Sequence, residues 1–153
     1  MKASKIEIVA KEIQLLRSED FDTVYFHGET MMPFLKEADE LIVTPIDVSE
    51  IKPGDIVTYL DDDKFPTRRV IQNLKTKSCF LIQGDSIPKR KYVVPYNLVI
   101  GIAVARKRKG KWIYSNRLAW KWAKFRVMKR ERLKYKTKNI KRLGIIQTFK
   151  RFF

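Results

Sequence analysis

Residues 51–60 read IKPGDIVTYL, a turn sequence followed directly by a strand sequence. The first half contains Pro, Gly and Asp, which favour turns, and the second half contains the β-branched and aromatic residues that favour sheets. The same alternation recurs at Asp61-Asp62-Asp63 and at Gly84-Asp85-Ser86, which separate runs rich in Val, Ile, Tyr and Phe. Short strands separated by such turns predict a mainly β body, arranged as an antiparallel, barrel-like sheet.

The strands are expected where these runs occur. They are residues Thr23–His27, Glu40–Pro45, Asp55–Leu60, Thr67–Asn73, Cys79–Gln83 and Leu98–Arg106. A further strand at Lys111–Tyr114 could close a hairpin with the last of these through the turn Lys107–Gly110. The β domain therefore spans residues 21–114.

Residues 1–20 are predicted to form a short amphipathic helix, because apolar residues recur there at helical spacing. Charged residues interrupt this segment, which therefore does not read as a secretory signal. No run in the chain approaches the roughly 20 apolar residues that a membrane-spanning helix needs. Cys79 is the one cysteine, so no intrachain disulfide can form. We expect a cytoplasmic protein that is at most peripheral at a membrane surface.

Residues 115–153 form a basic, aromatic-rich tail that is predicted to be at least partly helical. Asn116 is a suitable N-cap for this helix. One helix face would present Leu118, Trp122 and Phe125. That face is imperfect, because Trp120 and Val127 point elsewhere.

The net charge of the 153-residue chain is +16, made up of −2 from residues 1–105 and +18 from residues 106–153, where Glu131 is the one acid. Such a block attracts phosphates of lipid head groups or of nucleic acid. The interleaved aromatics are consistent with three roles. Packing of the helix onto the body ranks first, contact with an anionic membrane surface second and binding of single-stranded nucleic acid third. The candidate polyanion-binding residues are Lys121, Lys124, Arg126, Lys129 and Arg130.

Four motifs occur in a fixed order within the predicted β domain. They are GETMMP at 28–33, KPGDIV at 52–57, TRRV at 67–70 and QGDS at 83–86. Their order and spacing resemble the signal peptidase I superfamily, which includes the self-cleaving SOS and phage repressors. The resemblance covers roughly residues 21–113 and implies a coiled antiparallel β barrel with a serine-peptidase site.

The resemblance assigns a role to each motif position. In the family, a Ser in the first motif attacks the substrate carbonyl, and Thr30 occupies that position. Arg68 occupies the position of the family's Lys or His base, which Asp85 and Ser86 would support. The peptide-binding and oxyanion region, where backbone N–H groups would face the developing charge, comprises Gly28, Glu29, Met31 and Pro33.

Two departures from the family pattern indicate a degenerate site. A guanidinium such as that of Arg68 stays protonated and cannot deprotonate a hydroxyl at neutral pH. The extra methyl of Thr30 restricts its side-chain torsion and crowds attack. Asp85 could instead form a structural ion pair with Arg68 or Arg69. The leading hypothesis is therefore a homologue that binds an extended peptide or precursor protein without cleaving it.

Two alternatives remain open. The first is an active membrane-surface endopeptidase that uses Thr30 as nucleophile with an unconventional base. His27, the only histidine, is the nearest such base in sequence, but a structural or surface role fits it better. The second is a protein whose main function is polyanion binding through its tail. No zinc-ligand spacing and no glycine-rich phosphate loop occurs, so neither a metal nor another cofactor is expected.

Overall fold

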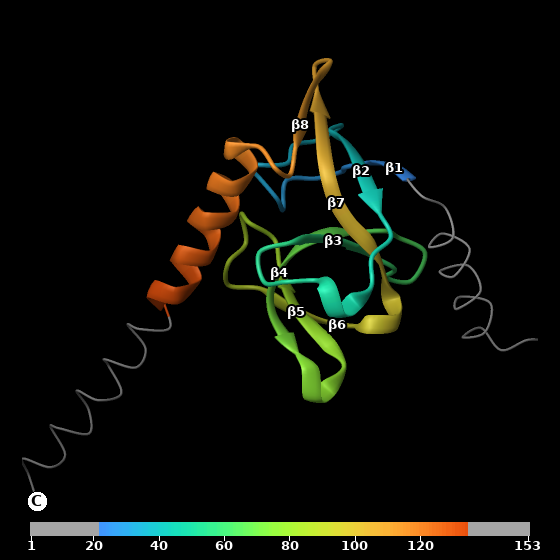
Figure 1. Cartoon of the computed structure of the whole chain (residues 1–153), viewed down its shortest axis with the longest axis vertical. Coiled ribbons are helices and arrows are strands. Elements are labelled where there is room, and N and C mark those ends of the chain that lie inside the picture. The colour runs from blue at the N-terminus through green and yellow to red at the C-terminus, as the bar shows by residue number, and fades with distance from the viewer. Residues whose placement is uncertain (1–21, 135–153) are drawn as a thin grey trace, which may run out of the picture.

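The computed structural model describes residues 22–134, which fold into one eight-stranded antiparallel sheet (Figure 1). The strands are β1 (Asp22–Tyr25), β2 (Glu40–Thr44), β3 (Ile56–Tyr59), β4 (Thr67–Leu74), β5 (Cys79–Gln83), β6 (Lys91–Pro95), β7 (Val99–Arg108) and β8 (Lys111–Tyr114). They are hydrogen-bonded in the order β1-β2-β7-β3-β4-β5-β6, and β8 pairs with β7. The sheet curls into a half-barrel.

Three short 3-10 helices connect the strands, at η1 (Val48–Glu50), η2 (Lys75–Lys77) and η3 (Tyr96–Leu98). An α-helix begins at residue 118 and continues to 134, the last described residue. This C-terminal helix runs alongside the sheet (Figure 1). No helix within the described part of the chain is long and apolar enough to cross a membrane.

The mainly β class predicted from the sequence is confirmed, and each expected strand overlaps an observed one. The hairpin of β7 and β8 also forms, with Arg108 opposite Lys111. One strand, β6, was not predicted. It lies at the edge of the sheet, and its apolar run, Tyr92-Val93-Val94, is short and is followed by Pro95, which disfavours a strand. The helix predicted over residues 1–20 lies outside the described residues.

Two hydrophobic clusters stabilise the half-barrel. The first lies between the loop after β1, strands β2, β3 and β7, and the C-terminal helix, and it includes Met31, Phe34, Leu35, Leu41, Ile56 and Trp120. The second lies against β3, β4 and β5 and includes Ile51, Val57, Val70, Phe80, Ile82 and Val99. The sequence motifs occupy the boundary between these clusters, because Met31 belongs to the first and Val57 to the second.

The C-terminal helix packs on the sheet through a different face from the one outlined by the sequence. Trp120 and Val127 are buried, and the Trp120 ring meets Phe34 edge-on at a centroid distance of 4.9 Å. Residues seven apart lie on one helix face, so these two side chains share the docking surface. Leu118, Trp122 and Phe125, the face expected from the sequence, are exposed to solvent.

The N-cap prediction was also wrong by one residue. The carbonyl of Arg117 accepts the N–H groups of Trp120 and Lys121, so Arg117 occupies the N-cap position. Asn116 lies in the turn that precedes the helix. The β7–β8 hairpin ends at Tyr114, and Asn116 lies in the turn that follows it. Asn116 therefore precedes the N-cap position by one residue.

Trp120→Ala should lower the free energy of unfolding by about 3–5 kcal/mol, because it removes a buried ring and leaves a cavity. Trp122→Ala is the matched control on the same helix and should change it by less than about 0.5 kcal/mol. Urea unfolding of the full chain, followed by circular dichroism, measures both. Equal losses would contradict the docking role of Trp120.

Candidate functional site

The loop that follows β1 is fixed by its own buried side chains. Met31 and Leu35 are fully buried, and the Leu35 N–H donates to the Met31 carbonyl at 3.0 Å. Gly28 has a φ of +95°, which a residue with a side chain rarely adopts. The Met32–Pro33 peptide bond is cis. The segment GETMMP is therefore a compact turn anchored in the first hydrophobic cluster.

His27 lies on the exposed side of this loop. Its Nδ1 is 2.9 Å from Oε1 of Glu37, and Glu37 also accepts the backbone N–H of Gly28. The hydrogen bond from Gly28, followed by that from His27, lowers the pKa of Glu37. His27 is therefore oriented toward Glu37, as expected for a surface residue with a structural role.

The turn Gly84-Asp85-Ser86 lies directly against Thr30. The Ser86 N–H donates to the Thr30 carbonyl at 3.0 Å, and the Ser86 hydroxyl donates to the Glu29 carbonyl at 2.8 Å. A Cβ atom at Gly84 would lie 2.4 Å from the Thr30 carbonyl oxygen, so only glycine permits this approach. The structure thus brings together two motifs more than 50 residues apart.

Asp85 forms a buried ion pair with Arg69, which settles the alternative that the sequence left open. Nε and Nη2 of Arg69 each donate to one carboxylate oxygen at 2.7 Å. The remaining Nη1 donates to the Gly54 carbonyl at 2.8 Å. The side chains of Arg69 and Asp85 are 0% and 3% exposed. This bidentate pair joins the motifs TRRV, KPGD and QGDS, so it is structural.

Arg68 and Thr30, the positions of base and nucleophile in the resemblance, make no hydrogen bond to each other in the described chain. Arg68 is half-buried, and its Nη1 donates to the Thr67 carbonyl at 2.9 Å. Burial raises the pKa of Tyr59, and the charge of Arg68 opposes that rise. The Thr30 hydroxyl oxygen is buried and has no hydrogen-bond partner among the described residues.

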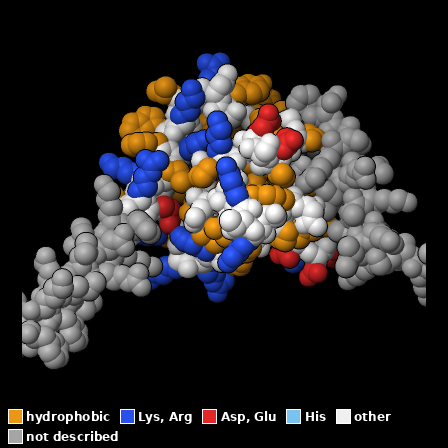
Figure 2. All heavy atoms as spheres, turned by 60° about the horizontal axis from the view of Figure 1, so that its bottom comes forward, with side chains coloured by type: hydrophobic (Ala, Val, Ile, Leu, Met, Phe, Trp, Pro, Cys, Tyr) orange, Lys and Arg blue, Asp and Glu red, His pale blue; other side chains and the backbone are white. Residues whose placement is uncertain are grey.

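The C-terminal helix is attached to the same motifs. Lys124 Nζ lies 3.2 Å from an Asp55 carboxylate oxygen, and Arg130 Nη2 donates to the Asp85 carbonyl at 3.0 Å. Two of the five candidate polyanion-binding residues therefore contact the body. The other three, which are Lys121, Arg126 and Lys129, are exposed. On the face shown in Figure 2, Lys and Arg side chains lie among hydrophobic ones, with few acids.

A cluster around Phe34 was missed by the sequence analysis. The Arg106 guanidinium lies 4.8 Å from the Phe34 ring centroid, and both Arg106 and Arg108 donate to the Phe34 carbonyl. Arg108 also pairs with Asp39 at 2.6 Å. Burial alone would raise the pKa of Asp39, but hydrogen bonds from Arg108 and from the Lys36 N–H outweigh it and lower the pKa. The one sequence signal for this cluster was the position of Phe34, directly after Pro33 of the first motif.

Among the described residues, no group is within hydrogen-bonding distance of the buried Thr30 hydroxyl, so no neutral side chain is positioned to accept its proton. Within residues 22–134, no group of three or more His, Cys, Asp or Glu side chains is placed to hold a metal ion.

Comparison with known proteins adds no assignment. No protein-family model matches the chain, and a search of curated proteins returned no match. The functional interpretation rests on the residues described above.

Arg69→Met should destabilise the protein by about 3–5 kcal/mol, because it leaves the Asp85 carboxylate buried and unpaired. Arg68→Met, the matched control on the adjacent residue, should cost less than about 1 kcal/mol. Urea unfolding at neutral pH measures the difference. A larger loss for Arg68→Met would show that the wrong arginine has been identified as structural.

Acid should weaken the attachment of the C-terminal helix through Glu131. Burial alone would raise the pKa of this carboxyl group, but hydrogen bonds from Lys91 and Gln83 outweigh burial and lower it. A lowered pKa in the folded state stabilises the protein above the unfolded-state pKa, and this contribution is lost as the pH falls through the folded-state value.

Glu131→Gln should therefore be less stable than the wild type at pH 7, and the difference should shrink as the pH falls below about 4. Urea midpoints of both proteins across that range provide the measurement. A difference that stays constant with pH would contradict an ionised, hydrogen-bonded Glu131.

Proposed function

We propose that this chain is a signal-peptidase-like domain, of the coiled β-barrel type, that binds an extended peptide without cleaving it. Three observations support the proposal: the ordered motifs, the curled antiparallel sheet, and the contacts that bring GETMMP, KPGD, TRRV and QGDS together. The observation that carries it is the buried Thr30 hydroxyl without a hydrogen-bonding partner among the described residues.

Loss of cleavage follows from the protonation states of the two key positions. A nucleophilic hydroxyl needs a neutral base within hydrogen-bonding reach. The position expected for the base holds Arg68, which remains a cation and donates to the Thr67 carbonyl. The Thr30 carbonyl and the Glu29 carbonyl are both engaged by Ser86. The loop is thus held in place while its hydroxyl stays unactivated.

Peptide binding is supported by the position of β1, which ends the strand order and leads directly into the Gly28–Pro33 loop. The Phe26 N–H donates to the Asp39 carbonyl, toward the β2 side of the strand. Successive N–H groups of an extended strand point to opposite sides, so that of Tyr25 points away from β2. An extended peptide can pair with this edge by strand addition.

The surface beside this edge can accommodate side chains of such a peptide. Tyr25 is 57% exposed and Met32 is 36% exposed, which provides apolar contacts at both ends of the loop. A Cβ at Gly28 would meet no described atom within 4 Å, so the space beside the loop is open. We therefore propose a peptide or precursor segment with apolar residues as the partner.

Tyr25→Pro should abolish peptide binding, because it removes the outward N–H donor of β1. Proline is tolerated on an edge strand where the N–H faces solvent, so the fold should survive. Tyr25→Ala is the matched control, since it removes the ring and keeps the donor. An array of peptides of about ten residues, each with or without alternate backbone N-methylation, measures binding by strand addition.

The wild type should bind a subset of the unmethylated peptides, and N-methylation should weaken binding by at least about tenfold. Tyr25→Ala should retain part of this binding, and Tyr25→Pro none. Mass spectrometry should show the peptides intact. A cleavage product that disappears in Thr30→Ala would refute the proposal, as would equal binding of methylated and unmethylated peptides.

A further inference from the structure

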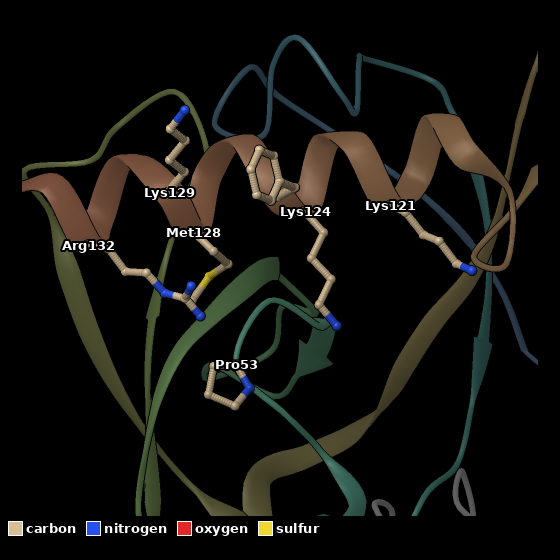
Figure 3. A pocket seen from close by; sticks show the side chains of 7 residues that line it. Pro53, Lys121, Lys124, Met128, Lys129 and Arg132 are labelled. Carbon is tan, nitrogen blue, oxygen red and sulfur yellow. The ribbon is translucent and has the colours of Figure 1, made fainter.

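A cleft of about 540 Å³ lies between the turn before β3 and the C-terminal helix (Figure 3). Its apolar lining consists of Pro53, Phe125 and Met128. Phe125 is 53% exposed, so its ring is available for contact with a ligand. The cleft involves neither β1 nor the Gly28–Pro33 loop, so it is separate from the proposed peptide edge.

The polar lining of the cleft is entirely cationic and consists of Lys121, Lys124, Lys129 and Arg132. Figure 3 shows Lys121, Lys124 and Arg132 extending from the helix to the side on which Pro53 lies. Lys124 is partly neutralised by Asp55 at 3.2 Å. Within residues 22–134, Lys121 and Arg132 have no acidic side chain within salt-bridge distance.

Glu131, the one acid of the helix, does not neutralise the cleft. Its carboxylate is held by Lys91 at 2.7 Å and by Gln83 at 3.1 Å, on the side of the helix that faces β5 and β6. The charges on the helix are therefore segregated, and the cleft has a net positive charge that favours an anion.

The hydrogen-bonding capacity of the cleft narrows the class of ligand. Ammonium and guanidinium groups only donate, and the lining side chains carry no oxygen acceptor, only the weak thioether acceptor of Met128. A phosphate presents acceptors to several cations at once, and Arg can bind it in a bidentate manner. A nucleobase edge carries donors that would find only the weak thioether acceptor of Met128 among the lining side chains. The remaining lining is apolar and suits a hydrocarbon portion.

We propose that this cleft binds a phosphate group joined to an apolar chain. Arg132 binds the phosphate in a bidentate manner, and Lys121 and Lys124 add positive charge farther along the cleft. Phe125 and Met128 contact the apolar portion. A soluble phosphate ester and a phospholipid head group share this chemistry, and the experiment separates them.

Monohexyl phosphate is the probe, and titration calorimetry with the full chain measures its binding. The double variant Lys121→Glu/Arg132→Glu should bind it at least about tenfold more weakly, because the charge-assisted contact of Arg132 is lost and two positive charges of the cleft become negative. Arg117→Glu/Arg126→Glu is the control, since it makes the same change in net charge at exposed residues outside the cleft lining. Phe125→Ser provides a second test and should weaken monohexyl phosphate without weakening inorganic phosphate.

Wild-type protein should bind monohexyl phosphate at least about tenfold more tightly than inorganic phosphate, because only the ester uses the apolar lining. Equal affinity for the two would overturn the proposal. So would equal losses in the two double variants, or tighter binding of adenosine monophosphate than of monohexyl phosphate.

Sedimentation with vesicles identifies the source of the phosphate. Binding to phosphatidylglycerol vesicles but not phosphatidylcholine vesicles, lost only in the cleft variant, would assign a lipid head group. Retained monohexyl phosphate binding without cleft-dependent vesicle binding would assign a soluble ester. Both outcomes support the site.

Discussion

The buried ion pair between Arg69 and Asp85 is the interaction on which the rest of the structure depends. Removing two charges from water is costly, and only good geometry with further hydrogen bonds offsets that cost. Here the pair is bidentate, and Arg69 also donates to the Gly54 carbonyl. Asp85 is followed by Ser86, whose N–H donates to the Thr30 carbonyl and so holds the loop. The carbonyl of Asp85 accepts a hydrogen bond from Arg130 of the C-terminal helix. One pair thus positions the loop, the turn before β3 and the helix.

Arg68, the neighbour of Arg69 in β4, does not take part in this ion pair. Successive side chains of a strand point to opposite faces, so the burial of Arg69 directs Arg68 to the other face of β4, beside Tyr59. A lysine or histidine at position 68 could lose its proton, but an arginine cannot. Under the proposed function, the β1 edge and the Thr30 loop bind a peptide backbone, and Arg68 cannot serve as the base that cleavage would need.

The sequence predicted most strands because turn residues alternate with β-branched runs, as in IKPGDIVTYL. It missed β6, because the apolar run of that strand is short and precedes Pro95, and it outlined the wrong helix face. Leu118, Trp122 and Phe125 form a regular apolar stripe, but Trp120 is the ring that fits against Phe34. Thr30, Asp85 and Ser86 lie in motifs that the resemblance assigned to one region, and Ser86 contacts the Thr30 loop. Local patterns do not encode contacts between distant segments. They therefore could not show that Asp85 pairs with Arg69 and not with Arg68, or that Lys124 and Arg130 attach the helix to the body.

A double-mutant cycle on Arg69 and Asp85 tests this account most directly. Arg69→Met and Asp85→Leu each leave one buried charge unpaired, whereas the combined variant leaves none. If the pair organises the fold, the combined variant should be no less stable than either single variant, and the coupling free energy from urea unfolding should be at least about 2 kcal/mol. Losses that add within about 0.5 kcal/mol would contradict it, because the two residues would then act independently.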